Sequence, residues 1–162
     1  MTDMLVKLYE LPPLEPVIQE QNNQGVVIRR GIAPEKHIVL DWIEKHFSLF
    51  WRSECDIAFC RLPISCFLAV YEESLVGFAC YDTTRRGFFG PTGVDDSMRG
   101  KGVGKALLIT CLHDMYTQGY GYGIIGGVGP IEFYEKVVGA TVIPNSTPGI
   151  YATMLRPSKS EL

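Results

Sequence analysis

The sequence lacks a long apolar run, a strong excess of one charge and spaced metal ligands. None of its 162 residues belongs to an apolar stretch near the roughly 20 residues that cross a membrane. The first ten residues contain an acidic residue, Asp3, and no apolar run of the kind found in signal peptides. We therefore expect neither a membrane partner nor a secretion signal. A net charge of -3 gives no general attraction for nucleic acids. The 3 histidines have no partner at metal-ligand spacing, so no metal site is expected.

The cysteines also lack a pattern, because they are odd in number and show no C-x-x-C spacing. They are Cys55, Cys60, Cys66, Cys80 and Cys111, and at least three lie in apolar runs. This usage is typical of reduced thiols, so we expect a cytoplasmic protein. The 162 residues, 46% apolar and 20% charged, fit one globular domain with a substantial core.

Three segments are expected along the chain. Residues 1–24 contain Leu11-Pro12-Pro13-Leu14-Glu15-Pro16 and an amide-rich run, which predict an irregular N-terminal arm. Residues 25–156 carry the periodic apolar positions and are expected to form the domain. Residues 157–162 are expected to be a polar C-terminal end.

Apolar periodicity predicts the order β-α-α-β-β-β-α-β-α-β-β within the domain. The expected helices are one from Pro34 to Phe47, one holding Trp51 to Ala58, Gly102–Gln118 and Pro130–Val138. The expected strands are Val26–Ile28, Cys66–Tyr71, Leu75–Tyr81, Gly87–Val94, Tyr122–Val128, Thr141–Ile143 and Ile150–Leu155. The fold class is therefore α/β, with a mixed, mostly antiparallel sheet of about seven strands flanked by about four helices.

A glycine-rich turn joins the strand ending at Val94 to the following helix. Its residues 99–105 read Arg-Gly-Lys-Gly-Val-Gly-Lys. Unpaired amides of a first helical turn and the helix dipole favour an anion, and glycines let it approach the backbone. Arg99, Lys101 and Lys105 add full positive charges in an otherwise acidic chain. A phosphate site is predicted here.

Two familiar phosphate loops do not fit these residues. A Walker-type loop requires glycine where Arg99 stands and Ser or Thr where Ala106 stands, and the dinucleotide fingerprint lacks its third glycine. The pattern that fits is Arg-x-x-Gly-x-Gly, at Arg99, Gly102 and Gly104. Together with a second motif, Ile131-Glu132-Phe133-Tyr134-Glu135-Lys136-Val137-Val138-Gly139-Ala140, it resembles the GNAT superfamily of acyl-coenzyme A dependent N-acetyltransferases over about Val26 to Leu155.

The resemblance implies a GNAT-like fold and an enzyme that transfers acetyl from acetyl-coenzyme A to a primary amine by direct attack in a ternary complex. The cofactor pyrophosphate would bind Arg99 and the amides of Gly100, Lys101, Gly102, Val103, Gly104 and Lys105. The Val94 backbone would pair with the pantetheine arm and donate to the thioester carbonyl. Tyr134 matches the position of the general acid that protonates the leaving thiolate.

The general base and the acceptor are left open. Residues 87–93 contain no carboxylate, so Asp95 or Asp82 could act only through water. The acceptor is an amine of a small molecule or a peptide, and a homodimer is left open. The main alternative is a non-catalytic acyl-coenzyme A binding module that acts as a sensor or scaffold. A nucleotide-binding regulator is a third interpretation.

Overall fold

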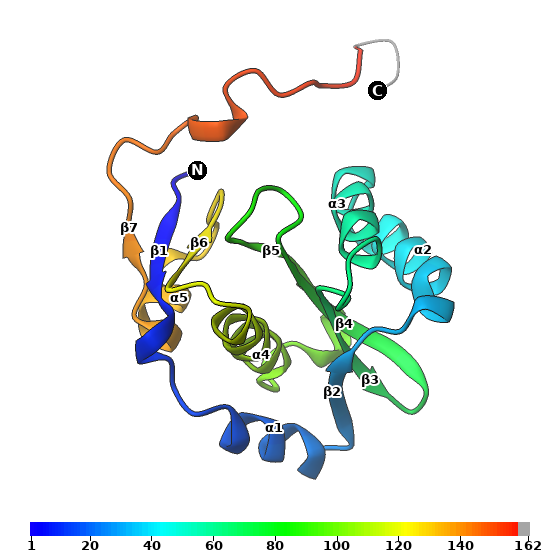
Figure 1. Cartoon of the computed structure of the whole chain (residues 1–162). Coiled ribbons are helices and arrows are strands. Elements are labelled where there is room, and N and C mark those ends of the chain that lie inside the picture. The colour runs from blue at the N-terminus through cyan, green and yellow to red at the C-terminus, as the bar shows by residue number, and fades with distance from the viewer. Residues whose placement is uncertain (159–162) are drawn as a thin grey trace.

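The computed structural model describes residues 1–158 as one mixed sheet with helices on both faces (Figure 1). The strand order is β2-β3-β4-β5-β6-β1-β7. The strands are β1 (Met4–Lys7), β2 (Val26–Arg30), β3 (Cys66–Tyr71), β4 (Ser74–Tyr81), β5 (Phe88–Val94), β6 (Tyr122–Ile125) and β7 (Thr141–Val142). The helices are α1 (Leu14–Asn23), α2 (Lys36–His46), α3 (Leu49–Phe59), α4 (Val103–Thr117) and α5 (Ile131–Val138). Every pairing is antiparallel except β5 with β6, which confirms the predicted fold class.

Alternating side chains of the central strands build a hydrophobic cluster on each face of the sheet. Phe67 and Ala69 of β3 pack on the face covered by α4, whereas Cys66 and Leu68 pack on the face covered by α2 and α3. Most of α4 is buried, in keeping with its contacts to the sheet and to α1. None of the helices in residues 1–158 is both long and apolar enough to span a membrane.

The N-terminal segment is not the irregular arm that its prolines and amides predicted. Met4 and Val6 of β1 are fully buried, and β1 pairs with β6 on one side and β7 on the other. Residues 14–23 form α1, a fifth helix. Pro13 precedes its first residue and Pro16 lies in its first turn, where no backbone N–H has a helical acceptor, so neither proline interrupts the helix.

The strand predicted at Ile150–Leu155 is wrong. β1 occupies the place beside β7 that this segment was expected to take. Residues 149–151 instead form a short 3-10 helix, followed by a turn and an extended tail in which Leu155 is 87% exposed. Met4 and Val6 alternate along β1 and place two apolar side chains in the core. The side chains of Met154 and Leu155 in the C-terminal segment stay exposed instead. Of the predicted polar end, residues 159–162 lie outside the described residues.

Candidate active site

Left-handed glycines shape the turn before α4. Gly100 has a φ of +77° and Gly102 a φ of +79°, conformations that strain residues with a side chain. No side chain caps the helix, and its first backbone hydrogen bond runs from the Ala106 N–H to the Gly102 carbonyl, at 3.0 Å. The N–H groups of Val103, Gly104 and Lys105 therefore lack a helical acceptor. Such a turn can hold a phosphate group.

The three predicted cations lie around this turn with exposed side chains. Arg99 Nε lies 2.9 Å from Asp96 Oδ1, and 68% of the Arg99 side chain is exposed. An exposed ion pair of this kind contributes about 0 to 1 kcal/mol, so Arg99 can exchange Asp96 for a phosphate at little cost. Lys101 Nζ lies 3.9 Å from the Met98 sulfur, and Lys105 projects from the first turn of α4.

Gln21 of α1 and Gln24, the residue that follows this helix, hold the same turn from the side of the N-terminal segment. The Nε2 atoms of Gln21 and Gln24 each donate to the Lys101 carbonyl oxygen at 3.0 Å. Gln21 is only 1% exposed, and a Cβ built on Gly102 would lie 3.1 Å from its Nε2. The sequence analysis missed both residues, because it interpreted the amide-rich run as a break in regular structure rather than as the face of a helix.

β5 separates from β6 after a short stretch of pairing. The pairs are Phe88 with Ile124 and Phe89 with Ile125, and no later residue of β5 pairs with β6 within residues 1–158. The Asp95 N–H bonds the Val76 carbonyl at 2.8 Å, so the neighbouring pair, Val94 opposite Gly77, is the non-hydrogen-bonded one. The backbone N–H and C=O of Val94 therefore point away from β4, toward the open edge.

Val94 is also close to the start of α4. Its Cγ2 atom would lie 3.6 Å from a Cβ built on Gly104. The other side of the strand is lined by Phe47, whose ring leaves no room for a Cβ on Gly93, with a closest separation of 2.3 Å. The open edge of β5 and the free amides of α4 are thus contiguous. An extended chain with a charged phosphate end matches this combination of surfaces.

Tyr134 lies on α5 and is 8% exposed. Its ring packs edge-on against Phe133, with centroids 5.1 Å apart, and its hydroxyl has no hydrogen-bond partner among residues 1–158. Burial raises the pKa of the Tyr134 phenol, which keeps it protonated at neutral pH. Tyr134 joins the hydrophobic cluster against which Val94 also packs. A proton donor is therefore available on this side of the sheet.

The two carboxylates considered as indirect bases are both engaged in structural contacts. Asp82 accepts from the Gly87 N–H at 2.6 Å and the Tyr120 hydroxyl at 2.7 Å, and it pairs with Arg61 at 3.0 Å. Asp95 accepts from the N–H and hydroxyl of Ser97, and these hydrogen bonds lower the pKa of its carboxyl. Neither aspartate has the free, poorly solvated oxygen that suits a base.

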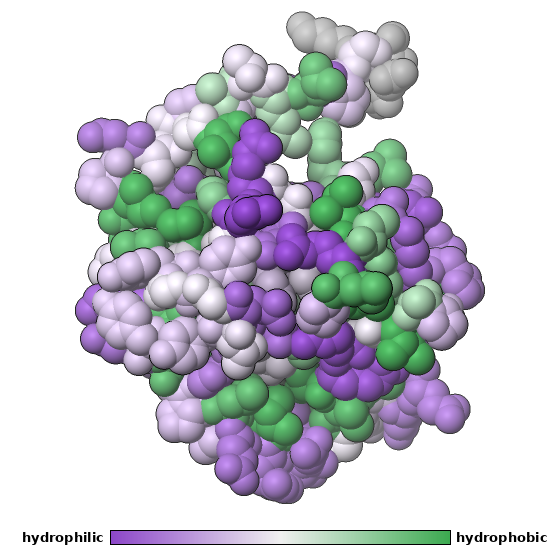
Figure 2. Space-filling view, viewed as in Figure 1, coloured by the Kyte–Doolittle hydropathy of each residue, from purple (hydrophilic) through white to green (hydrophobic). Residues whose placement is uncertain are grey.

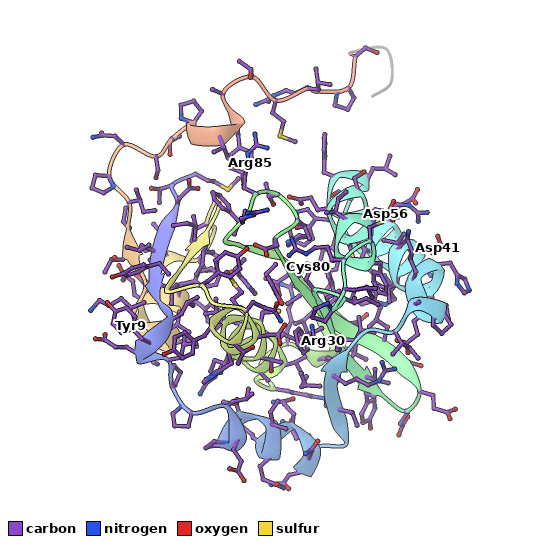
Figure 3. The ribbon with its side chains drawn as sticks, viewed as in Figure 1. Tyr9, Arg30, Asp41, Asp56, Cys80 and Arg85 are labelled. Carbon is purple, nitrogen blue, oxygen red and sulfur yellow. The ribbon has the colours of Figure 1, made fainter. Side chains whose placement is uncertain are left out.

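Three buried thiols form a cluster on the opposite face of the sheet. The Sγ atoms of Cys55, Cys66 and Cys80 lie within 4.8 Å of one another, between β3, β4 and α3 (Figure 3). By distance alone they could ligate a thiophilic ion. Burial raises the pKa of the Cys66 and Cys80 thiols, which favours their neutral forms, whereas hydrogen bonds with these two thiols lower the pKa of Cys55 to about 5. The cluster takes no part in the site at α4.

A family model for the acetyltransferase (GNAT) family matches residues 36–140. This range includes β5, the glycine turn, α4, β6 and α5. The chain belongs to the GNAT acetyltransferase family. GNAT proteins are acyltransferases that use acetyl-coenzyme A. The turn before α4 and the open edge of β5 both lie within the range that the family model matches. No curated protein sequence matches the chain.

Solved structures show the same GNAT fold at low sequence identity. A GCN5-related glucosamine N-acetyltransferase region of a fungal multi-domain GH3 β-N-acetylglucosaminidase superposes with a TM-score of 0.72 and 11% identity, covering 88% of this chain and 19% of that one. A GCN5-related N-acetyltransferase from Sphaerobacter thermophilus gives a TM-score of 0.62 and 21% identity, covering 88% and 48%. The chain thus spans less than half of either neighbour.

Proposed function

We propose that this chain transfers an acetyl group from acetyl-coenzyme A to a primary amine by direct attack within a ternary complex. The observation that carries the proposal is the continuity between the unpaired amides of α4 and the unpaired edge of β5. A pyrophosphate fits the first surface and an extended pantetheine arm fits the second. Binding residues would be Arg99, the backbone of residues 100–105 and the Val94 backbone.

The residues around the open edge of β5 and the start of α4 match the needs of acyl transfer. Acetyl-coenzyme A supplies a thioester whose carbonyl carbon accepts the amine. The Val94 N–H faces the open strand edge and would donate to the carbonyl oxygen as that oxygen gains negative charge. The Tyr134 hydroxyl would give its proton to the departing sulfur, since burial keeps the phenol protonated at neutral pH. Holding both reactants side by side removes the entropy cost of their encounter.

The test is amine-dependent release of thiol from acetyl-coenzyme A by the purified chain. The panel contains diamines and polyamines, aminoglycosides, amino acids and peptides with free amino termini. We expect release above the uncatalysed rate with at least one amine class, together with an acetylated amine product detected by mass spectrometry. Thiol release without acetylated amine would indicate thioester hydrolysis and would contradict the proposal.

The second candidate function is an acyl-coenzyme A binding module without turnover. It is favoured by one observation, the absence of a carboxylate on β5, residues 88–94. Calorimetry separates the two functions. Binding of coenzyme A without activity across the whole panel would support the binding module, whereas tighter binding of ATP or NAD than of coenzyme A would contradict both.

A further inference from the structure

A glutamate that the sequence analysis did not consider lies near the point where β5 separates from β6. Glu54 lies on α3, one turn after Trp51, which packs against Phe47 with ring centroids 4.9 Å apart. The Thr84 hydroxyl, in the loop before β5, donates to Glu54 Oε1. The neighbouring Thr83 hydroxyl donates to the Gly90 carbonyl at 2.9 Å, which ties this loop to the open part of β5. Glu54 is thus held near Gly90, four residues before Val94, on the part of β5 that no longer pairs with β6.

The contacts of Glu54 leave one of its oxygens free. Oε1 takes the Thr84 hydroxyl, and Oε2 has no hydrogen-bond partner among residues 1–158. The residue is half-buried, and burial raises the pKa of its carboxyl. A carboxylate with a raised pKa accepts a proton more readily than an exposed one. A second acidic residue of α3, Asp56, is engaged elsewhere. Its Oδ1 atom lies 2.6 Å from Lys36 Nζ on α2 (Figure 3).

The C-terminal segment passes over the top of the molecule in the view of Figure 1 and Figure 2. Tyr151 reaches the point where β5 and β6 separate, because a Cβ built on Gly126 would lie 2.9 Å from the Tyr151 hydroxyl oxygen and from the Phe88 ring. Burial raises the pKa of the Tyr151 phenol, and the negative charges of Glu54 and then Asp3 raise it further. Glu54 and Asp3 therefore both contribute a negative electrostatic potential at the Tyr151 hydroxyl.

Asp3 contributes to this potential from the N-terminal segment. It is 6% exposed, and its Oδ1 accepts the Gly127 N–H at 2.8 Å, directly after β6. A group of opposite charge, Arg85, is exposed on the loop before β5, at the rim below the C-terminal segment (Figure 3). Arg85 is exposed, so solvent screens its charge more than the charge of buried Asp3, and a positively charged ligand would be favoured near the two carboxylates over a ligand that carries its own carboxylate.

We infer that Glu54 attracts the ammonium group of the acceptor and takes its proton through intervening water, and that the acceptor is a cationic primary amine without a carboxylate. This inference rests on the proposed acetyl transfer. The ammonium gives one proton to Glu54 through this water, and the nitrogen lone pair then forms the bond to the carbonyl carbon. The carbon–sulfur bond breaks, its electron pair stays on sulfur, and sulfur takes the Tyr134 proton. The second proton lost by nitrogen restores Tyr134 through solvent, and Glu54 releases its proton to solvent.

The test compares Glu54→Gln with Asp56→Asn, the same carboxylate-to-amide change on the other side of α3. The amide oxygen introduced by Glu54→Gln can still accept from Thr84, so the fold is expected to persist. With 1,4-diaminobutane as acceptor, we expect kcat/KM to fall roughly 100-fold or more in Glu54→Gln and to be unchanged in Asp56→Asn. Wild type should gain activity as pH rises through the raised pKa of Glu54, and Glu54→Gln should lose this acid limb.

Binding gives a second readout that does not depend on turnover. Calorimetry of 1,4-diaminobutane against the protein saturated with coenzyme A should show binding to wild type and at least tenfold weaker binding to Glu54→Gln, whereas glutamate should not bind either protein. Equal binding and an unchanged acid limb in Glu54→Gln would overturn the inference while leaving acetyl transfer intact. Failure of wild type to bind coenzyme A would instead contradict the proposed function.

Discussion

At the scale of single residues, the proposed chemistry depends on Tyr134 and Glu54, two side chains whose pKa values burial raises. Burial raises the pKa of Tyr134, so the phenol remains an acid, and raises the pKa of Glu54, so the carboxylate becomes a stronger base. The pair would bracket the pH range of activity, with Glu54 ionised above its pKa and Tyr134 protonated below its own. Environment rather than residue type assigns the acid and the base.

Tyr134→Phe tests the acid. The ring is retained, so packing on Phe133 and affinity for coenzyme A should change little, whereas turnover should fall by roughly 100- to 10,000-fold, the usual loss for a general acid. In wild type, activity should fall as pH rises through the Tyr134 pKa, above the ordinary phenol value of about 10, and the substitution should abolish this alkaline limb.

The matched control is Tyr116→Phe, since Tyr116 lies on α4 with an exposed side chain. Steady-state rates from neutral to alkaline pH provide the measurement. Wild-type turnover and an unaltered profile in Tyr134→Phe would show that this tyrosine only packs.

At the scale of elements, α1 supports the turn before α4, where we propose that the cofactor binds. The Gln21 side chain is buried and donates to the Lys101 carbonyl, but its Oε1 has no partner in the described part of the chain. Leaving that oxygen unpaired costs stability, so a Gln21→Met variant should fold at least as well as wild type. The lost hydrogen bond contributes about 0.5 to 1.5 kcal/mol, which corresponds to roughly two- to tenfold weaker binding of coenzyme A if the turn loosens.

Gln19→Met is the control for this prediction, because Gln19 lies on the same helix but bonds only the neighbouring exposed Asn23, at 2.9 Å. Calorimetric titration of both variants with coenzyme A measures the effect, and thermal melting verifies the fold. If Gln21→Met binds coenzyme A as tightly as wild type does, α1 has no role in cofactor binding.

The elements differ in how far the sequence predicts them, for physical reasons. The strand, glycine turn and helix around residues 88–117 are set by local signals, namely apolar periodicity and the conformations that only glycine adopts without strain. The place of β1 is set by a pairing with residues more than 100 positions away, so no local pattern reveals it. Glu54 was equally hidden, since its contact with Thr84 depends on how α3 packs on the sheet.

At the scale of the whole molecule, the sheet brings residues from near both ends of the described chain to the place where β5 and β6 separate. β1 fills the place between β6 and β7, and the Asp3 N–H bonds the Ser146 hydroxyl at 2.8 Å. Asp3 and Tyr151 consequently meet where β5 and β6 separate, although the sequence places them near opposite ends. The proposed cofactor turn lies after the end of β5 at Val94, and the proposed acceptor site lies near Gly90, an arrangement that a transfer reaction between two bound ligands would require.

The central claim, that the turn before α4 holds the pyrophosphate, is tested most directly by calorimetric titration of coenzyme A against Gly104→Val. A Cβ at Gly104 meets only Val94, at 3.6 Å, and Gly121, whose Cβ would meet nothing within 4 Å, provides Gly121→Val as the control. We predict binding to wild type and Gly121→Val, and at least tenfold weaker binding to Gly104→Val because the added methyl groups obstruct the amides. Unchanged affinity in a Gly104→Val protein with an intact fold would contradict the account.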